Sequence, residues 1–233
     1  MAEDVTWGTI QGQPITFPMN VGDFNAATMG FSVPAAAAVA LLPGDAFEVI
    51  EIAPGVAQLI VSICDYRDNP WGAYNEVNLG LLARPQGAGD EVIGSFIYRM
   101  PVDQAFTCEA GNLVMGFPKV VTRIGADYTE DQVTFALFDE GAPALTVTVP
   151  RVRSESDPTR IETTSYSYLD GVAHATPLAM DMSSATVEPD DVRLTIGAGP
   201  IADELASLGL PTAPDFCTWG EHLSATFQLG TPL

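Results

Sequence analysis

Lys119 is the only lysine in a chain of 233 residues that has nine basic residues in all. The other eight are arginines, at positions 67, 84, 99, 123, 151, 153, 160 and 193. Arginine can replace lysine in most surface roles, but its guanidinium stays protonated and cannot act as a neutral amine. A position where lysine persists is therefore a candidate for amine chemistry. The alternative is a surface lysine that persists by chance.

The residues around Lys119 are apolar. Leu113-Val114-Met115-Gly116-Phe117-Pro118 precedes it and Val120-Val121 follows it. An ammonium group is poorly solvated in such surroundings, which favours the neutral amine. A neutral lysine amine can attack a ketone or aldehyde and form an imine. These surroundings are compatible with imine chemistry at Lys119.

A carboxylate lies on one face of a predicted strand, residues 74–82. Tyr74 and Glu76 share that face with Asn78 and Gly80, while the apolar residues between them occupy the other face. If the polar face lines the interior of a barrel, Glu76 can move protons for imine chemistry. The alternative is a solvated strand face.

Acidic residues dominate the charge of the chain. There are 30 Asp and Glu against nine Lys and Arg, which gives a formal net charge of -21. Nucleic acids and anionic membrane surfaces are bound by patches of Lys and Arg, so neither is expected as a partner. An anionic substrate is repelled at long range and needs a local positive charge inside a pocket. The main consequence of the net charge is solubility.

The sequence contains no recognisable motif for a metal or nucleotide cofactor. His174 and His222 lack the spacing of metal-ligating pairs, and no phosphate-binding or dinucleotide motif occurs. The three cysteines, Cys64, Cys108 and Cys217, are scattered, which is typical of free thiols in a reducing compartment. No signal peptide or bilayer-spanning apolar run is visible. We therefore expect a cytoplasmic protein that needs no cofactor.

Apolar and polar residues alternate along most of the chain, in segments that end at Gly, Pro, Asn or Asp, which predicts strands and turns. Strands are expected at 56–64, 74–82, 92–100, 133–138, 144–149, 161–168, 192–196 and 222–229, and a polar loop at 65–72. One helix is expected between Pro34 and Gly44, and another at 201–208. The prediction is one mainly β, antiparallel domain over residues 1–233 with a few helices.

Two segments resemble the acetoacetate decarboxylase superfamily: Gly72-Ala73-Tyr74-Asn75-Glu76, and the stretch from Gly111 that ends in Phe117-Pro118-Lys119. That family carries a Gly-x-Tyr-x-Glu element and an aromatic-Pro-Lys-Lys element, whose first lysine forms a Schiff base. The resemblance implies a cone-shaped antiparallel β-barrel with an apolar cavity, assembled into homo-oligomers. It also implies that Lys119 is the nucleophile.

The resemblance also suggests roles for the residues near Lys119. Glu76 would move protons, and Tyr74 would help to place Glu76 or the substrate. Met115 and Phe117 would form walls of the cavity. The implied partner is a small oxo acid or another small carbonyl compound.

The chain departs from the family pattern in several places. The second lysine of the aromatic-Pro-Lys-Lys element is Val120. The family's arginine near the N-terminus, which meets the substrate carboxylate, has no counterpart, because Arg67 is the first arginine. The candidates for its replacement are Arg123 and Arg99. The predicted strand 56–64 also lacks the family's additional glutamate.

Three functions are compatible with these residues. The first is a lyase that breaks a carbon–carbon bond by decarboxylation, through a Schiff base on Lys119. The second is an aldolase–dehydratase that uses the same lysine on pyruvate-like substrates. The third is a non-catalytic barrel that binds a small apolar ligand. Acetoacetate itself is expected to be a poor substrate, because a carboxylate left unpaired in an apolar pocket costs several kcal/mol.

Overall fold

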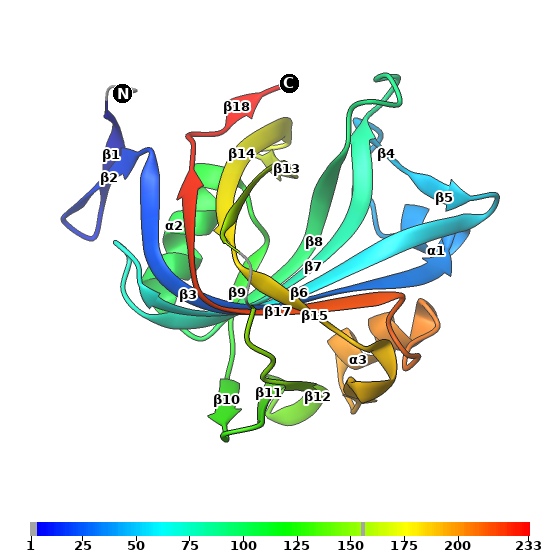
Figure 1. Cartoon of the computed structure of the whole chain (residues 1–233). Helices are drawn as coiled ribbons and strands as arrows, with labels where there is room; N and C mark the ends of the chain where they lie inside the picture. The colour runs from blue at the N-terminus through cyan, green and yellow to red at the C-terminus, as the bar shows by residue number, and fades with distance from the viewer. Residues whose placement is uncertain (1–3, 155–156) are drawn as a thin grey trace.

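The computed structural model describes residues 4–154 and 157–233. Its largest feature is a closed ring of seven strands (Figure 1). Their order around the ring is β17 (Phe216–Phe227), β3 (Met19–Pro34), β6 (Val56–Asp68), β7 (Tyr74–Pro85), β8 (Gly94–Val102), β13 (Thr159–Leu169) and β14 (Val172–Met182). The ring closes because β14 pairs with β17. β8 and β13 pair in parallel, and the other neighbours in the ring are antiparallel. A closed ring leaves no free strand edge. The expected mainly β barrel is confirmed.

The remaining strands form small sheets or extend the ring. A hairpin is formed by β1 (Val5–Ile10) and β2 (Gln13–Phe17). A separate four-stranded sheet has the order β10 (Ile124–Tyr128), β11 (Gln132–Asp139), β12 (Ala142–Pro150) and β16 (Arg193–Ile196). The strands that pair with members of the ring are β4 (Phe47–Val49), β5 (Glu51–Ala53), β9 (Lys119–Val121), β15 (Ser184–Val187) and β18 (Thr231–Pro232).

Helices are short and few. They are α1 (Ala35–Val39), α2 (Ala105–Met115) and α3 (Pro200–Ser207), with a 3₁₀ turn, η1 (Pro189–Asp191). In the part of the chain that the structure describes, no helix is both long and apolar enough to cross a membrane.

Two apolar clusters lie on opposite sides of the barrel strands. The four-stranded sheet and α3 lie outside the barrel, on the side away from α2 (Figure 1). Alternate residues of β3, β6 and β7 point toward that layer and form one continuous core with side chains from β11, β12 and α3. The second cluster lies inside the barrel, between the ring strands, α2 and the β1–β2 hairpin.

The structure corrects several expected boundaries. Residues 65–68, expected in a loop, belong to β6, because Asp65 and Tyr66 pair with residues of β3. α1 ends at Val39, well before Gly44. β17 begins at Phe216 rather than at residue 222. The helix α2, the strand β14 and the strands before α1 were not expected at all.

Candidate active site

Lys119 lies at the start of β9, shortly after α2. Gly116 ends the helix with a left-handed backbone (φ 65°), and β9 then pairs in parallel with β8, with Lys119 opposite Met100. The Lys119 side chain points into the barrel cavity and is 4% exposed. Val120, next along the strand, is 47% exposed. The position that holds a second lysine in the family pattern therefore faces away from the cavity in this chain.

Glu76 of β7 forms a buried ion pair with Lys119. Its Oε2 atom lies 2.7 Å from Nζ, and the Glu76 side chain is 5% exposed. The contact is an ion pair rather than an aligned hydrogen bond, and Oε2 has no aligned donor elsewhere in the described residues. Removing one partner of a buried pair leaves an uncompensated charge, at a cost of about 3–5 kcal/mol. Because the Glu76 side chain is only 5% exposed, the face of β7 that carries it is buried rather than solvated.

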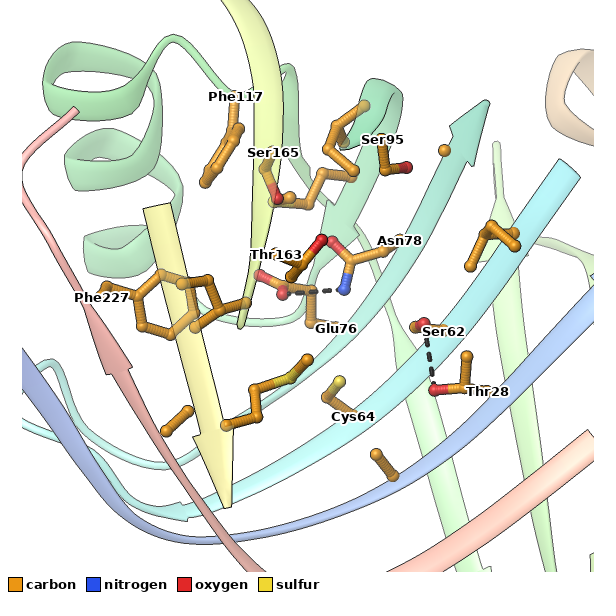
Figure 2. A pocket seen from close by; sticks show the side chains of 18 of the residues that line it. Thr28, Ser62, Cys64, Glu76, Asn78, Ser95, Phe117, Thr163, Ser165 and Phe227 are labelled. Atoms are coloured by element: carbon orange, nitrogen blue, oxygen red, sulfur yellow. Dashed lines mark hydrogen bonds between the residues drawn. The ribbon is translucent and has the colours of Figure 1, made fainter. Parts of the chain in front are cut away.

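Two side chains contact the other carboxylate oxygen of Glu76, Oε1. Asn78 donates to it from Nδ2 at 3.1 Å, and the Tyr66 hydroxyl donates at 3.4 Å. Figure 2 shows Asn78 beside Glu76 on the cavity wall. Residues two apart on a strand point to the same side, so β7 itself brings Glu76 and Asn78 together. These contacts fix the orientation of the carboxylate toward the amine.

The Lys119 side chain is positioned mainly by α2. The Thr107 hydroxyl accepts a hydrogen bond from Nζ at 3.1 Å. Gly111, one turn later, leaves room for the side chain: a Cβ at this position would lie 2.6 Å from Cδ and 2.7 Å from Cε of Lys119. From β7, the Tyr74 ring lies beside the ammonium, with its centroid 5.2 Å from Nζ, which is within cation–π distance.

The titratable side chains next to this ion pair stay neutral. Burial raises the pKa of the Tyr66 phenol, the Tyr74 phenol and the Cys64 thiol well above their usual values, and the negative charge of Glu76 raises each further. These groups keep their protons at neutral pH. No group of three or more His, Cys, Asp or Glu side chains in the described ranges is placed to hold a metal ion.

The ion pair borders a cavity of about 320 Å³ with mainly apolar walls. Tyr74, Glu76, Met115, Phe117 and Lys119, all proposed from the sequence, line it together. They come from β7, from the end of α2, from the segment that leads into β9 and from the first residue of β9. The structure therefore brings together five of the residues that sequence reasoning selected.

Arg123 is not brought to this cavity. Its side chain is exposed, and its guanidinium carbon lies 3.4 Å from the centroid of the Phe138 ring. Arg99, the other candidate partner for a substrate carboxylate, donates two hydrogen bonds to Glu204, at 3.1 and 3.0 Å. Neither guanidinium lines the cavity. Neither arginine is therefore in position to contact a substrate carboxylate inside the cavity.

Sequence reasoning missed Thr107 and Tyr66, which contact the two members of the ion pair. Thr107 lies in the unexpected helix α2. Two features of the sequence point to this helix. Thr107 and Gly111 are four residues apart and would share one helix face, and Gly116 is a typical helix terminator. Tyr66 was assigned to a loop, and only its pairing with β3 and β7 places it inside the barrel.

A family model matches nearly the whole chain. The model described as acetoacetate decarboxylase (ADC) covers residues 7–226. A search of curated proteins found no match.

Several solved structures share the fold at low sequence identity. Acetoacetate decarboxylase from Legionella pneumophila is 15% identical, with a TM-score of 0.68 over 93% of this chain and 87% of that one. An acetoacetate decarboxylase-like enzyme from Sphingomonas wittichii is 14% identical, with a TM-score of 0.62 over 98% of each chain. The enduracididine biosynthesis enzyme MppR, complexed with pyruvate, is 16% identical, with a TM-score of 0.61 over 99% of this chain and 98% of that one. With a family match over residues 7–226 and the same barrel fold, this protein belongs to the acetoacetate decarboxylase family.

Proposed function

We propose that the protein is a lyase that forms an imine on Lys119 and breaks a carbon–carbon bond of an oxo acid by decarboxylation. One observation carries the proposal: the Lys119 amine and the Glu76 carboxylate lie 2.7 Å apart, buried in the wall of an apolar cavity. Membership of the acetoacetate decarboxylase family supports it.

Glu76 would first make the amine nucleophilic. The carboxylate takes a proton from the Lys119 ammonium, and the neutral amine attacks the ketone carbon of the substrate. A proton moves from nitrogen to the former carbonyl oxygen, which gives a neutral carbinolamine. Glu76 then returns its proton to the hydroxyl group, which leaves as water with the electrons of the carbon–oxygen bond. The products are a cationic iminium on Lys119 and an ionised Glu76.

The iminium would then accept electrons from the bond that breaks. The bond between the α-carbon and the carboxylate carbon opens, CO₂ leaves, and its electron pair forms the double bond of a neutral enamine. A proton from solvent, relayed by Glu76, adds to the α-carbon and restores the iminium. Water hydrolyses the iminium, which releases the ketone and the Lys119 amine. Overall, one oxo-acid anion and one proton give one ketone and one CO₂.

The surroundings of the ion pair favour this bond-breaking step. Within the described residues, Lys119 is the only cationic side chain on the cavity wall. The substrate carboxylate would therefore face apolar and uncharged polar groups and have no fixed cation apart from the iminium. Loss of neutral CO₂ removes a poorly solvated charge, so desolvation accelerates the reaction.

A second candidate reaction uses the same iminium. MppR, which has the same fold, was solved in complex with pyruvate. This likeness favours an aldol-type condensation or cleavage of a pyruvate-like substrate, in which the bond to a hydroxylated carbon forms or breaks in place of the bond to a carboxylate.

Turnover assays can separate the two reactions. The protein is incubated with acetoacetate, with a longer 3-oxo acid, and with pyruvate plus an aldehyde, while CO₂ release and the ultraviolet absorbance of an unsaturated oxo acid are followed in parallel. We expect CO₂ from a 3-oxo acid, and none in Lys119→Arg, which keeps the charge and removes the nucleophile. Absorbance without CO₂ would favour the second candidate. No reaction with any compound would contradict both and favour a ligand-binding barrel.

A further inference from the structure

We infer that the natural substrate carries an apolar tail beyond its reacting carbonyl group, and no charge other than the carboxylate next to the reacting bond. The inference rests on the proposed function for the carbonyl chemistry. The tail site itself is argued from the cavity walls alone.

The charges on the cavity wall leave no place for a second anionic group. In the part of the chain that is described, Lys119 and Glu76 are the only charged side chains that line the cavity, and they pair with each other. The other polar side chains there are uncharged, such as Asn78, Ser95 and Thr163. They can offer hydrogen bonds, but they cannot neutralise an anion. A second charged group held inside the cavity would therefore be buried without a partner.

One side of the cavity is an unbroken apolar surface, which we call the tail wall, formed by Met19, Leu178, Met180, Ala225 and Phe227. The sheet register makes it continuous. Phe227 pairs with Met19 of β3 on one side and with Leu178 of β14 on the other, and Ala225 pairs with Met180. In Figure 2, Glu76 lies between Phe227 and the hydrogen-bonded Thr28 and Ser62. The cavity thus has an apolar side and an uncharged polar side around the ion pair.

Methionine is concentrated around this cavity. The chain has seven methionines, and among the described residues five of them line the cavity: Met19, Met100, Met115, Met180 and Met182. Methionine side chains are flexible and polarizable, so they adapt to apolar ligands of irregular shape. A lining of this kind suits a variable hydrocarbon tail better than a compact, charged oxo acid.

Two exposed isoleucines mark where the apolar lining reaches the surface. Ile93 and Ile161 line the cavity, yet they are 56% and 45% exposed. Ile161 pairs with Met180, so it continues the tail wall outward. A tail that begins near Lys119 can therefore run along Met180 to Ile161 without meeting a charged side chain of the described wall.

The tail would supply the binding energy that the absent arginine does not. Binding energy from a remote part of a substrate can offset the desolvation of its reacting group. Each buried methylene is expected to strengthen binding about fourfold, until the cavity is full. Cavities of ~300 Å³ and more hold ligands much larger than a four-carbon oxo acid, so several methylenes can contribute.

Calorimetric titration with a series of 2-alkanols, from pentan-2-ol to nonan-2-ol, tests the tail site directly. These compounds have no carbonyl group, so imine formation cannot contribute to their affinity. We expect the dissociation constant to fall about fourfold for each added methylene. 8-Hydroxynonanoate, which matches nonan-2-ol but ends in a carboxylate, should bind at least about tenfold more weakly. Affinities that do not change with chain length, or equal affinity for the carboxylate, would overturn the inference.

Two variants locate the tail, with a matched control. Ile161→Ser and Met180→Ser are each expected to weaken the binding of nonan-2-ol about fivefold and to affect pentan-2-ol less. Ile161 is half exposed, so this variant keeps the test open if Met180→Ser does not fold. Ile52→Ser is the control, because Ile52 is 46% exposed and is not part of the cavity lining. Equal effects of Ile161→Ser and Ile52→Ser would place the tail elsewhere and overturn the inference.

The result of the alkanol titrations is independent of the imine chemistry proposed for Lys119. If the alkanols bind as expected but no oxo acid reacts, the tail site stands and the lyase proposal fails. If oxo acids react but acetoacetate outperforms every longer homologue, the lyase proposal stands and the tail inference fails.

Discussion

The two faces of β7 differ in composition and packing although they belong to the same strand. The outward face is apolar and closely packed, with Val77, Leu79 and Leu81 at most 1% exposed. The inward face carries Glu76 and Asn78 and borders the cavity. Since alternate residues of a strand point to opposite faces, one short segment contributes both to the core and to the candidate site.

The difference between the two faces of β7 explains how an ion pair is placed inside the apolar interior of the barrel. The outward face packs against the four-stranded sheet and α3, and this packing fixes the register of β7. A slip of one residue would turn Leu79 into the cavity and Glu76 into the core, so the register is strongly specified. The packed face thus positions the reactive face.

The largest expected effect follows from removing the charge on the inward face. Glu76→Gln should lower kcat about 10²–10⁴-fold, because it removes a general acid–base group. Loss of a buried ionic partner should also lower the free energy of unfolding by about 3 kcal/mol. Steady-state kinetics and urea denaturation measure the two effects.

Glu162→Gln is the matched control for Glu76→Gln, because the Glu162 side chain is 78% exposed. It should leave both quantities unchanged. An unchanged kcat in Glu76→Gln would assign Glu76 a structural role only.

A substitution on the outward face should reduce stability and leave catalysis nearly unchanged. Leu79→Ala should lower the free energy of unfolding by about 2–5 kcal/mol, because it leaves a void in a closely packed core. The kcat of the folded fraction should change little. Urea denaturation combined with activity per folded molecule provides the test. A loss of kcat as large as that in Glu76→Gln would show that the two faces are not independent.

A methyl group at Gly111 should displace the amine without harming the fold. In Gly111→Ala, the new Cβ would press against the Cδ and Cε atoms of Lys119. A shift of about 1 Å in a reacting group can cost about 10²-fold in rate, while alanine in a helix interior is more stable than glycine by roughly 0.5–1 kcal/mol. We expect lower kcat with an unchanged or higher melting temperature. Gly125→Ala is the control, because no atom of a non-adjacent residue lies within 4 Å of the new Cβ, and its kcat should not change. Equal kcat in both variants would show that the Lys119 side chain can accommodate the extra methyl group.

The smallest effect is expected at Asn78, next to Leu79 in sequence and on the opposite face. Asn78→Ala removes a hydrogen bond to the Glu76 carboxylate and should lower kcat about tenfold, since hydrogen bonds to charged groups contribute ~1.5–3 kcal/mol. Stability should change much less than in Leu79→Ala. Asn78→Asp should be slower still, because it places a second negative charge beside Glu76. Equal activity of Asn78→Asp and the wild type would remove Asn78 from the site.

Local patterns predicted the parts of the site that depend on one segment. The alternation along residues 74–82 correctly separated Glu76 from Leu79, and the strands expected at 133–138 and 144–149 correspond to β11 and β12. The apolar context of Lys119 correctly predicted its burial.

The rest of the site depends on contacts between distant segments. α2 contains Thr107, Gly111 and Asn112, which are weak helix formers, so its helical state was not visible from propensity. Its neighbours in the fold, not its sequence, bring Thr107 to the Lys119 amine. Arg123 shows the opposite error: it lies close to Lys119 in sequence, but the chain turns away after β9 and places it on Phe138.

Reductive trapping tests whether Lys119 forms an imine with the substrate. The protein is treated with borohydride in the presence of an oxo acid that it turns over, and the modified residue is identified by peptide mass mapping. The assignment is clear, because Lys119 is the only lysine in the chain. We expect a substrate-derived mass on the Lys119 peptide and no adduct in Lys119→Arg. A substrate that is turned over but never labels Lys119 would contradict the imine mechanism.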